Sequence, residues 1–199
     1  MTQVERKTLC ALMRQELLIH ALLHDIRGSA TSLMGWQEML PDVGGKAISG
    51  LGRSVSGLVG CIQLFSSAPE APRPSEPCDL ESVARNLDIP LEGELEAFEL
   101  DTSRLEAASW MAGATGFSVQ RTPGAPGCED KMELRIQGLP SAGIRLLLSP
   151  QSQSLLAAAK ENGPVLGACL FKEVVRGVRG DYVSNEDSGL LCLRLPIEA

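Results

Sequence analysis

The first 65 residues contain two runs of apolar residues at helical spacing, and this pattern restricts the fold more than any other feature of the chain. The first run predicts a helix from near Gln3 to about Leu40, because apolar side chains recur every three or four residues. Pro41, Gly44 and Gly45 then break the helix. The second run has the same spacing and predicts another helix: Ile48, Leu51, Val55, Leu58, Ile62 and Phe65.

Two long helices joined by a short turn expose an apolar stripe that they cannot bury alone. A two-fold partner would bury the stripe in a four-helix bundle, so we expect a homodimer. Cover by the rest of the chain is the alternative. The proline-rich segment PEAPRPSEP follows and marks a domain boundary. The sequence therefore predicts a helical hairpin domain at 1–68, a linker at 69–78 and a second domain at 79–199.

Helical and strand patterns are mixed in the second domain. Helices are predicted at LESVARNL with Asp79 or Asp88 at its boundary, at Thr102–Gly113 with Asp101 or Thr102 as the cap, and at Val165–Arg176. Strands are predicted at Leu95–Leu100, around Met132–Ile136, at Ile144–Leu148 and in the closing hairpin YVSNEDSGLLCLRLPI. These elements predict an α/β sandwich with helices on one face of a mostly antiparallel sheet, so that the whole chain is an α+β protein.

Composition excludes several classes of protein. The net charge is −7 and the chain has no basic run, which argues against a nucleic-acid partner. The six cysteines are scattered, as expected of reduced, buried side chains in a cytoplasmic protein. The start, MTQVERKTLC, is too polar for a signal peptide. No stretch approaches the roughly 20 apolar residues needed to cross a bilayer, so we expect no membrane association.

A histidine and a carboxylate are adjacent in the run HALLHDIRGSATSL, and this pair suggests phosphate chemistry on an imidazole. A neutral imidazole attacks phosphorus through one ring nitrogen while the other nitrogen keeps its proton. Asp25 would accept a hydrogen bond from that second nitrogen of His24, a form of assistance worth on the order of 10²–10⁴ in rate. The chain has only two histidines, so the acceptor is His24 or His20.

Helix phase predicts that both histidines are accessible. With Ile19 as the centre of the apolar stripe, His24 lies roughly 140° away around the helix. His20, Arg27 and Thr31 lie roughly 80–120° away on the same flank. Both histidines would then line a solvated strip, in which Arg27 would attract an incoming phosphate.

Two other interpretations of this segment remain open. A helical His-Asp pair is most often an ordinary solvated pair, so the phosphate interpretation depends on the rest of the chain. Glu16, His20 and His24 also step by four along one flank, as zinc ligands do. Because no fourth ligand is nearby in the sequence, we predict no metal site.

Over nearly its whole length the chain resembles the dimerisation-and-phosphotransfer domain and the ATP-binding domain of bacterial histidine kinases. HDIRGSATSLMGWQEML is similar to the phosphoacceptor pattern, and PCDLESVARNL to the start of the ATP-binding domain. PVLGACLFKEVVRGVRGDYVSNEDSGLLCLRLP resembles the glycine-rich end of that domain and its final hairpin. LDTSRLEAASWMAGAT stands where the family has its asparagine box.

The chain departs from this family at the nucleotide site. Met111 and Thr115 stand roughly where the family has asparagines, one of which carries the magnesium of ATP. SPQSQS stands where the family has an aspartate that reads adenine, followed by two glycines. The glycine-rich lid is reduced to Gly163 and Gly167. The resemblance therefore implies a degenerate domain that does not bind ATP.

A chain that keeps the histidine without the ATP site resembles the histidine phosphotransferases built on a kinase scaffold. The resemblance implies that phosphate passes from a receiver aspartate of a response regulator to His24 and on to another receiver. The chain would bind no cofactor, since Mg²⁺ arrives with the receiver. The residues expected to contact the receiver are Leu17, His20, Ala21, Gly28 and Thr31.

Two alternatives belong to other functional classes. The chain would be a non-catalytic pseudokinase scaffold if it docked receivers or kinases without carrying phosphate. It would be a divergent histidine kinase if it still used ATP. Gly28 stands where many kinases carry a polar phosphatase residue, which argues against a dephosphorylating activity.

Overall fold

A computed structural model describes residues 1–39, 77–93, 98–123, 130–149, 157, 160–176, 178, 181–185 and 188–196. The chain divides into two compact units, one made of Met1–Leu18 with Arg73–Ala199 and the other of Ile19–Pro72. The expected hairpin domain ended at residue 68, whereas this division assigns the first 18 residues to the unit that contains the sheet. The second predicted helix and most of the linker lie outside the described residues.

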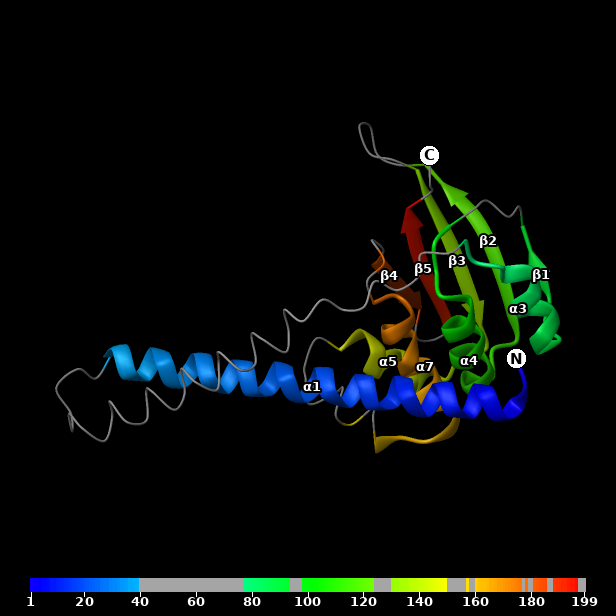
Figure 1. The fold of residues 1–199 in the computed structure, drawn as a ribbon. Helices are drawn as coiled ribbons and strands as arrows, with labels where there is room; N and C mark the ends of the chain where they lie inside the picture. Colours follow the sequence, from blue (N-terminus) through cyan, green and yellow to red (C-terminus); the bar gives the residue numbers. More distant parts are fainter. Residues whose placement is uncertain are drawn as a thin grey trace. The chain divides into compact units, whose positions relative to one another are not determined.

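The first predicted helix is confirmed as α1 (Gln3–Met39), drawn in blue in Figure 1. It begins with a capping box, in which the backbone N–H of Glu5 donates to Thr2 Oγ1 and the backbone N–H of Thr2 donates to Glu5 Oε2. Within the sheet-containing unit, Cys10 and Met13 are part of the main apolar core, and Leu17 is fully buried with Cys169. The start of α1 is therefore a structural part of that unit.

A five-stranded sheet forms the centre of the same unit, and its strand order is β1-β2-β3-β5-β4. The strands are β1 (Leu91–Glu92), β2 (Gly116–Thr122), β3 (Lys131–Gln137), β4 (Asp181–Asn185) and β5 (Leu190–Pro196). Only β1 and β2 pair in parallel, so the sheet is mostly antiparallel, as predicted. In the central register, Leu134 of β3 pairs with Val119 of β2 and Leu193 of β5.

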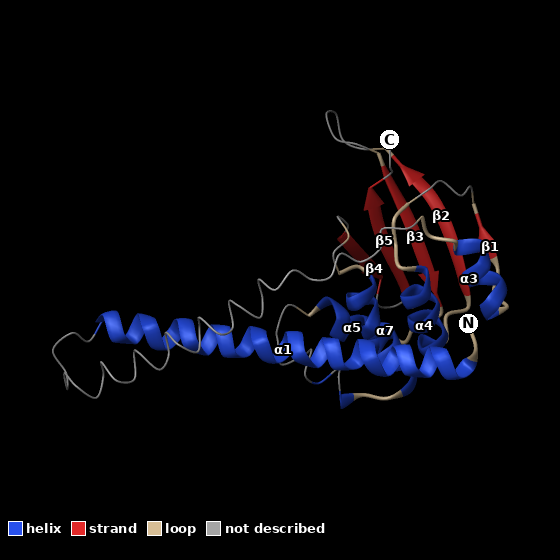
Figure 2. Cartoon of the chain, viewed as in Figure 1, coloured by secondary structure: helices blue, strands red, loops and turns tan. Residues whose placement is uncertain are grey.

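The helices of this unit begin and end at residues that suit those positions. They are α3 (Leu80–Leu87), α4 (Thr102–Ala112), α5 (Ser141–Leu148) and α7 (Gly163–Val174). The side chains of Asp79 and Asp101 accept hydrogen bonds from the first turns of α3 and α4. Gly113 ends α4 in the left-handed conformation that glycine adopts without strain. Figure 2 shows α4 and α7 together on one side of the sheet.

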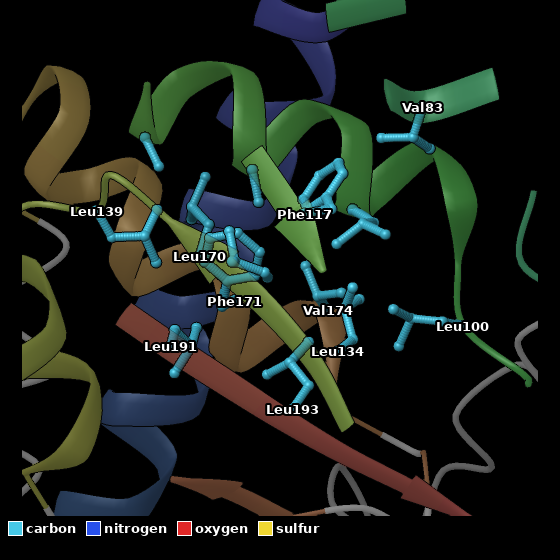
Figure 3. Packing of buried hydrophobic residues seen from close by; sticks show 14 of the residues in the cluster. Val83, Leu100, Phe117, Leu134, Leu139, Leu170, Phe171, Val174, Leu191 and Leu193 are labelled. Carbon is cyan, nitrogen blue, oxygen red and sulfur yellow. The ribbon is translucent and has the colours of Figure 1, made fainter. Parts of the chain in front are cut away.

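The core of this unit lies between the sheet and these helices (Figure 3). Alternate residues along each strand point inward, as the pleat of a strand requires. The inward residues of the three central strands are Phe117, Val119, Met132, Leu134, Ile136, Leu191, Leu193 and Leu195. They belong to one apolar cluster with Leu105 of α4 and with Leu170, Phe171 and Val174 of α7. The coarse prediction of an α+β fold is therefore confirmed.

Two strand predictions have different outcomes. The prediction of a strand at Ile144–Leu148 is wrong, because these residues belong to helix α5. Helical spacing there buries Ile144 and Leu147 together, which a strand would place on opposite faces. Of the predicted strand at Leu95–Leu100, residues 95–97 lie outside the described residues, and Glu99 forms an isolated antiparallel bridge with Pro77.

Candidate functional site

The candidate phosphate-accepting segment lies within α1. His24, Asp25 and Arg27 belong to the helix by their backbone, and their side chains lie outside those described. Each helical residue advances about 1.5 Å and turns about 100°. His20 and Gly28 are therefore each about 6 Å from His24 along the axis and on the same side of α1. The backbone of the helix thus places the two histidine positions along one flank.

One helical turn after His24, the surface of α1 is open. Gly28 is exposed, and a Cβ added to it would meet no atom within 4 Å. Thr31, one turn further, is also exposed. Ser32 donates a hydrogen bond from Oγ to the carbonyl oxygen of Gly28 at 3.0 Å. Another molecule can therefore approach the backbone of α1 closely at Gly28.

Two of the expected receiver contacts are buried. Leu17 and Ala21 each have 0% exposed surface, and Leu17 packs with Cys169, Leu18 and Leu146. Neither side chain offers surface to a partner in this structure, so we remove both from the candidate docking surface. The sequence did not indicate their burial because it does not specify which face of α1 packs on the rest of the chain. His20 is half-buried.

The exposed apolar side chains of α1 form a stripe on a different face from Leu17. Apart from Val4 near the start of the helix, the large ones are Leu12, Ile19, Leu22 and Ile26, with exposed fractions of 47%, 54%, 48% and 38%. We call these four residues the α1 stripe. They occupy the a and d positions of a heptad repeat, in which the remaining d position is Gln15. The Ile19 face of α1 is apolar, and its large side chains from Leu12 to Ile26 are exposed, whereas Ala30 further along the same face is buried.

The residues that the resemblance places at a nucleotide site lie on or near α4 and α7. Met111 is half-buried in the last turn of α4, and Thr115 is exposed just before β2. Gly163 begins α7 with a φ of +60°, whereas Gly167 lies in tight contact with α4. A Cβ on Gly167 would lie 2.2 Å from the backbone nitrogen of Ala112. Gly167 is therefore explained by helix packing. Of the SPQSQS segment, only Ser149 is described.

Four cysteines belong to the described part of the chain, and all four are free thiols. Cys10, Cys169 and Cys192 are buried, as predicted, whereas Cys78 is half-buried. Burial raises the pKa of Cys10 to about 11 and that of Cys169 to about 12. These thiols therefore stay protonated and unreactive near neutral pH.

The described residues include neither a candidate metal site nor a candidate membrane span. No group of three or more histidine, cysteine or acidic side chains there lies close enough together to hold a metal ion. The trio of Glu16, His20 and His24 includes a side chain outside that set. No described helix combines the length and the apolar character needed to cross a membrane.

The sequence matches no protein-family model and no curated protein sequence.

Proposed function

We propose that this protein is a histidine phosphotransferase that relays phosphate between receiver aspartates through His24. The observation that supports this most is the open backbone at Gly28, one turn from His24 on the same side of α1. Phosphoryl transfer requires the reacting atoms to approach within about 3–3.5 Å, so the donor has to lie directly against the helix. Gly28 and Thr31 give a receiver that access.

The proposed reaction needs no group from the chain beyond the histidine and its neighbours. A ring nitrogen of neutral His24 attacks the phosphorus of the aspartyl phosphate, and the bond from phosphorus to the aspartate oxygen breaks. The carboxylate leaves with the electron pair, and the second ring nitrogen keeps its proton. Asp25 would accept a hydrogen bond from that N–H, and Arg27 would attract the phosphate. Attack by a second receiver's aspartate on the phosphohistidine completes the relay.

The sheet-containing unit supports phosphate entry from a receiver rather than from ATP. Neither Met111 nor Thr115 carries the carboxamide that holds magnesium in the kinases that the chain resembles. Gly167 is occupied in the contact between α4 and α7, where it cannot serve a mobile phosphate-binding loop. Magnesium bound to the receiver would stabilise the charge on the transferring phosphoryl group.

The α1 stripe supports the accompanying proposal of a homodimer. Apolar residues at a and d positions are buried against another helix in stable proteins, and these four are 38–54% exposed. A second copy of the chain would cover the stripe in a four-helix bundle. A cytoplasmic location is part of the same proposal, because receivers act there.

The α1 stripe also favours a second candidate function, that of a non-catalytic scaffold. Ile19, Leu22 and Ile26 offer an apolar helix face to a partner helix without any need for His24. In that case the histidine is an ordinary polar residue of the helix surface. The two functions differ in whether the chain carries phosphate.

Transfer from pre-phosphorylated receiver domains, freed of ATP, tests the proposal on the wild type, His24→Ala and His20→Ala. We expect acid-labile, alkali-stable label on the wild type and on His20→Ala. His24→Ala should lose at least about 100-fold in label, because the nucleophile is gone. His20→Ala is the matched control, since it makes the same change one turn away.

The other possible results of the transfer experiment each lead to a different conclusion. Label that persists on His24→Ala and disappears from His20→Ala moves the acceptor by one turn. If no receiver from the same organism labels the wild type, the phosphotransferase proposal is rejected. Receiver binding that is equal for wild type and His24→Ala would then favour the scaffold.

A further inference from the structure

The first half of α1 contacts α4 through two ion pairs of opposite polarity. Arg6 of α1 donates from Nε to Oε1 of Glu106 at 2.7 Å. Ten residues further along α1, Glu16 accepts hydrogen bonds from both terminal nitrogens of Arg104, with Nη2 to Oε1 at 2.9 Å. The side chains of Arg6 and Arg104 are each 12% exposed and that of Glu106 is 4% exposed. The side chain of Glu16 is 26% exposed, so the Arg6–Glu106 pair is largely removed from water and the Glu16–Arg104 pair only in part.

The spacing of these charges determines how the two helices cross. Arg6 and Glu16 lie about 15 Å apart along α1. Arg104 and Glu106 are only two residues apart on α4, about 200° around its axis, so they project to opposite flanks. Both pairs form together only if α1 crosses α4 steeply, with the middle of the segment between Arg6 and Glu16 over α4.

An apolar contact occupies this crossing. Cys10, midway between the two charged residues of α1, donates from Sγ to the carbonyl oxygen of Ala107 at 3.3 Å. The raised pKa of Cys10, caused by burial, keeps the thiol proton that this contact needs. Met13 beside it is fully buried. Apolar burial stabilises the contact but is non-directional, so it does not by itself select one orientation of α1.

Each charge of α4 has a second partner within the same unit. Glu106 also accepts a hydrogen bond from Nδ2 of Asn86 at 3.0 Å. Arg104 also pairs through Nε with Asp101 Oδ2 at 3.2 Å. These contacts hold the α4 side chains in the positions that α1 meets, so less side-chain entropy is lost when α1 docks.

We propose that the two ion pairs allow α1 to dock on the sheet-containing unit in only one direction and only one register. Turned end for end, α1 would bring Arg6 to Arg104 and Glu16 to Glu106, placing like charges in a contact shielded from water. A slip by one helical turn would separate both pairs by about 5.4 Å. The first residues of the chain are thus held in a fixed register on a domain built from Arg73–Ala199. This proposal does not depend on the proposed function.

A charge-reversal cycle in the full chain tests the Glu16–Arg104 pair, with amide hydrogen exchange of residues 4–18 as the readout. Glu16→Arg and Arg104→Glu each place like charges together and should speed this exchange at least about tenfold. The double variant restores an opposite-charge pair. Its exchange rate should return at least about half of the way to the wild-type rate on a logarithmic scale. Asp101, the other partner of Arg104, limits the recovery. A double variant that exchanges as fast as the faster single variant overturns the proposal.

A swap on α1 tests the direction of docking. Arg6→Glu with Glu16→Arg keeps composition and net charge but inverts the charge order, so it should speed exchange of residues 4–18 at least about tenfold. Lys7→Glu is the control, because Lys7 is exposed on the same helix, and it should stay within about twofold of wild type. Unchanged exchange in the swap variant, or an equal effect of Lys7→Glu, overturns the proposal. Exchange in β3 separates local release of α1 from global unfolding.

Discussion

Glu106 as a whole residue is 3% exposed, and its local contacts favour its charged form. Burial raises the pKa of its carboxyl group, but hydrogen bonds from Asn86 and Arg6 and the nearby amino terminus outweigh that effect and lower the pKa below its ordinary value. The carboxylate is therefore more stable in the folded chain than in the unfolded chain. This difference links the attachment of α1 to pH.

Acid should weaken this attachment. Because the folded pKa of Glu106 lies below the ordinary value of 4.5, its contribution to stability is complete above that value and is lost as the pH falls through the folded pKa. Glu106→Gln cannot ionise, so it should cost roughly 1–3 kcal/mol at pH 7. It should also flatten the decline in the free energy of unfolding between about pH 5 and 3. Urea unfolding across this range measures both effects, and parallel pH profiles for the two proteins would contradict the argument.

At the scale of elements, the contact between α4 and α7 depends on the absence of a side chain at Gly167. A Cβ there would lie 2.2 Å from the nitrogen of Ala112 and 2.5 Å from the carbonyl carbon of Met111. Both atoms are backbone and cannot rotate away. The two helices therefore approach each other more closely than any other residue at this position permits.

Gly167→Ala should destabilise the fold by at least about 1–3 kcal/mol, because the helices have to separate. This loss would outweigh the gain of up to about 1 kcal/mol that alanine brings to a helix interior. Gly28→Ala is the matched control. Its Cβ meets no other atom, so only the gain in helix propensity remains, and the free energy of unfolding should rise instead of falling. Urea denaturation of the two variants measures the difference, and the same sign for both would refute the packing argument.

At the scale of the whole molecule, α1 has two apolar faces with different roles. Met13 and Leu17 are fully buried in the sheet-containing unit. Leu12 and Ile19 belong to the exposed α1 stripe. A helix that is apolar on two sides normally has two packing partners. The sheet-containing unit is one of them, and the proposed second copy of the chain would supply the other.

Charging the α1 stripe should therefore shift the protein from dimer to monomer. Ile19→Lys with Leu22→Lys places two like charges at the centre of the proposed interface and should weaken dimerisation at least about 100-fold. Val183→Lys is the control, since Val183 is an exposed apolar residue of β4. Light scattering across a concentration series gives the mass of each protein. A wild type that is monomeric at all concentrations would reject the homodimer.

The elements that local chemistry determines were predicted from the sequence. Apolar periodicity indicated α1 over nearly its exact length, and Asp101 and Gly113 indicated both ends of α4. The alternation around Leu134 indicated β3, and the closing hairpin was predicted as well. The strand β2 was missed, although Phe117 and Val119 alternate with polar residues and carried the signal. Caps, turns and periodicity act between residues close in sequence, so they can be read without the fold.

The tertiary structure alone decided which face of α1 is buried and which state the apolar run of α5 adopts. The sequence placed Ile19 at the centre of the apolar stripe of α1, but the face that packs into the sheet-containing unit carries Met13 and Leu17, and Ile19 is 54% exposed. The run GIRLLL suits a strand or a helix. In the structure it is helical, and in this conformation Gly143 lies in close contact with α7. The physical reason is the same in both cases. Local sequence permits two apolar arrangements, and surfaces distant in the chain select one of them.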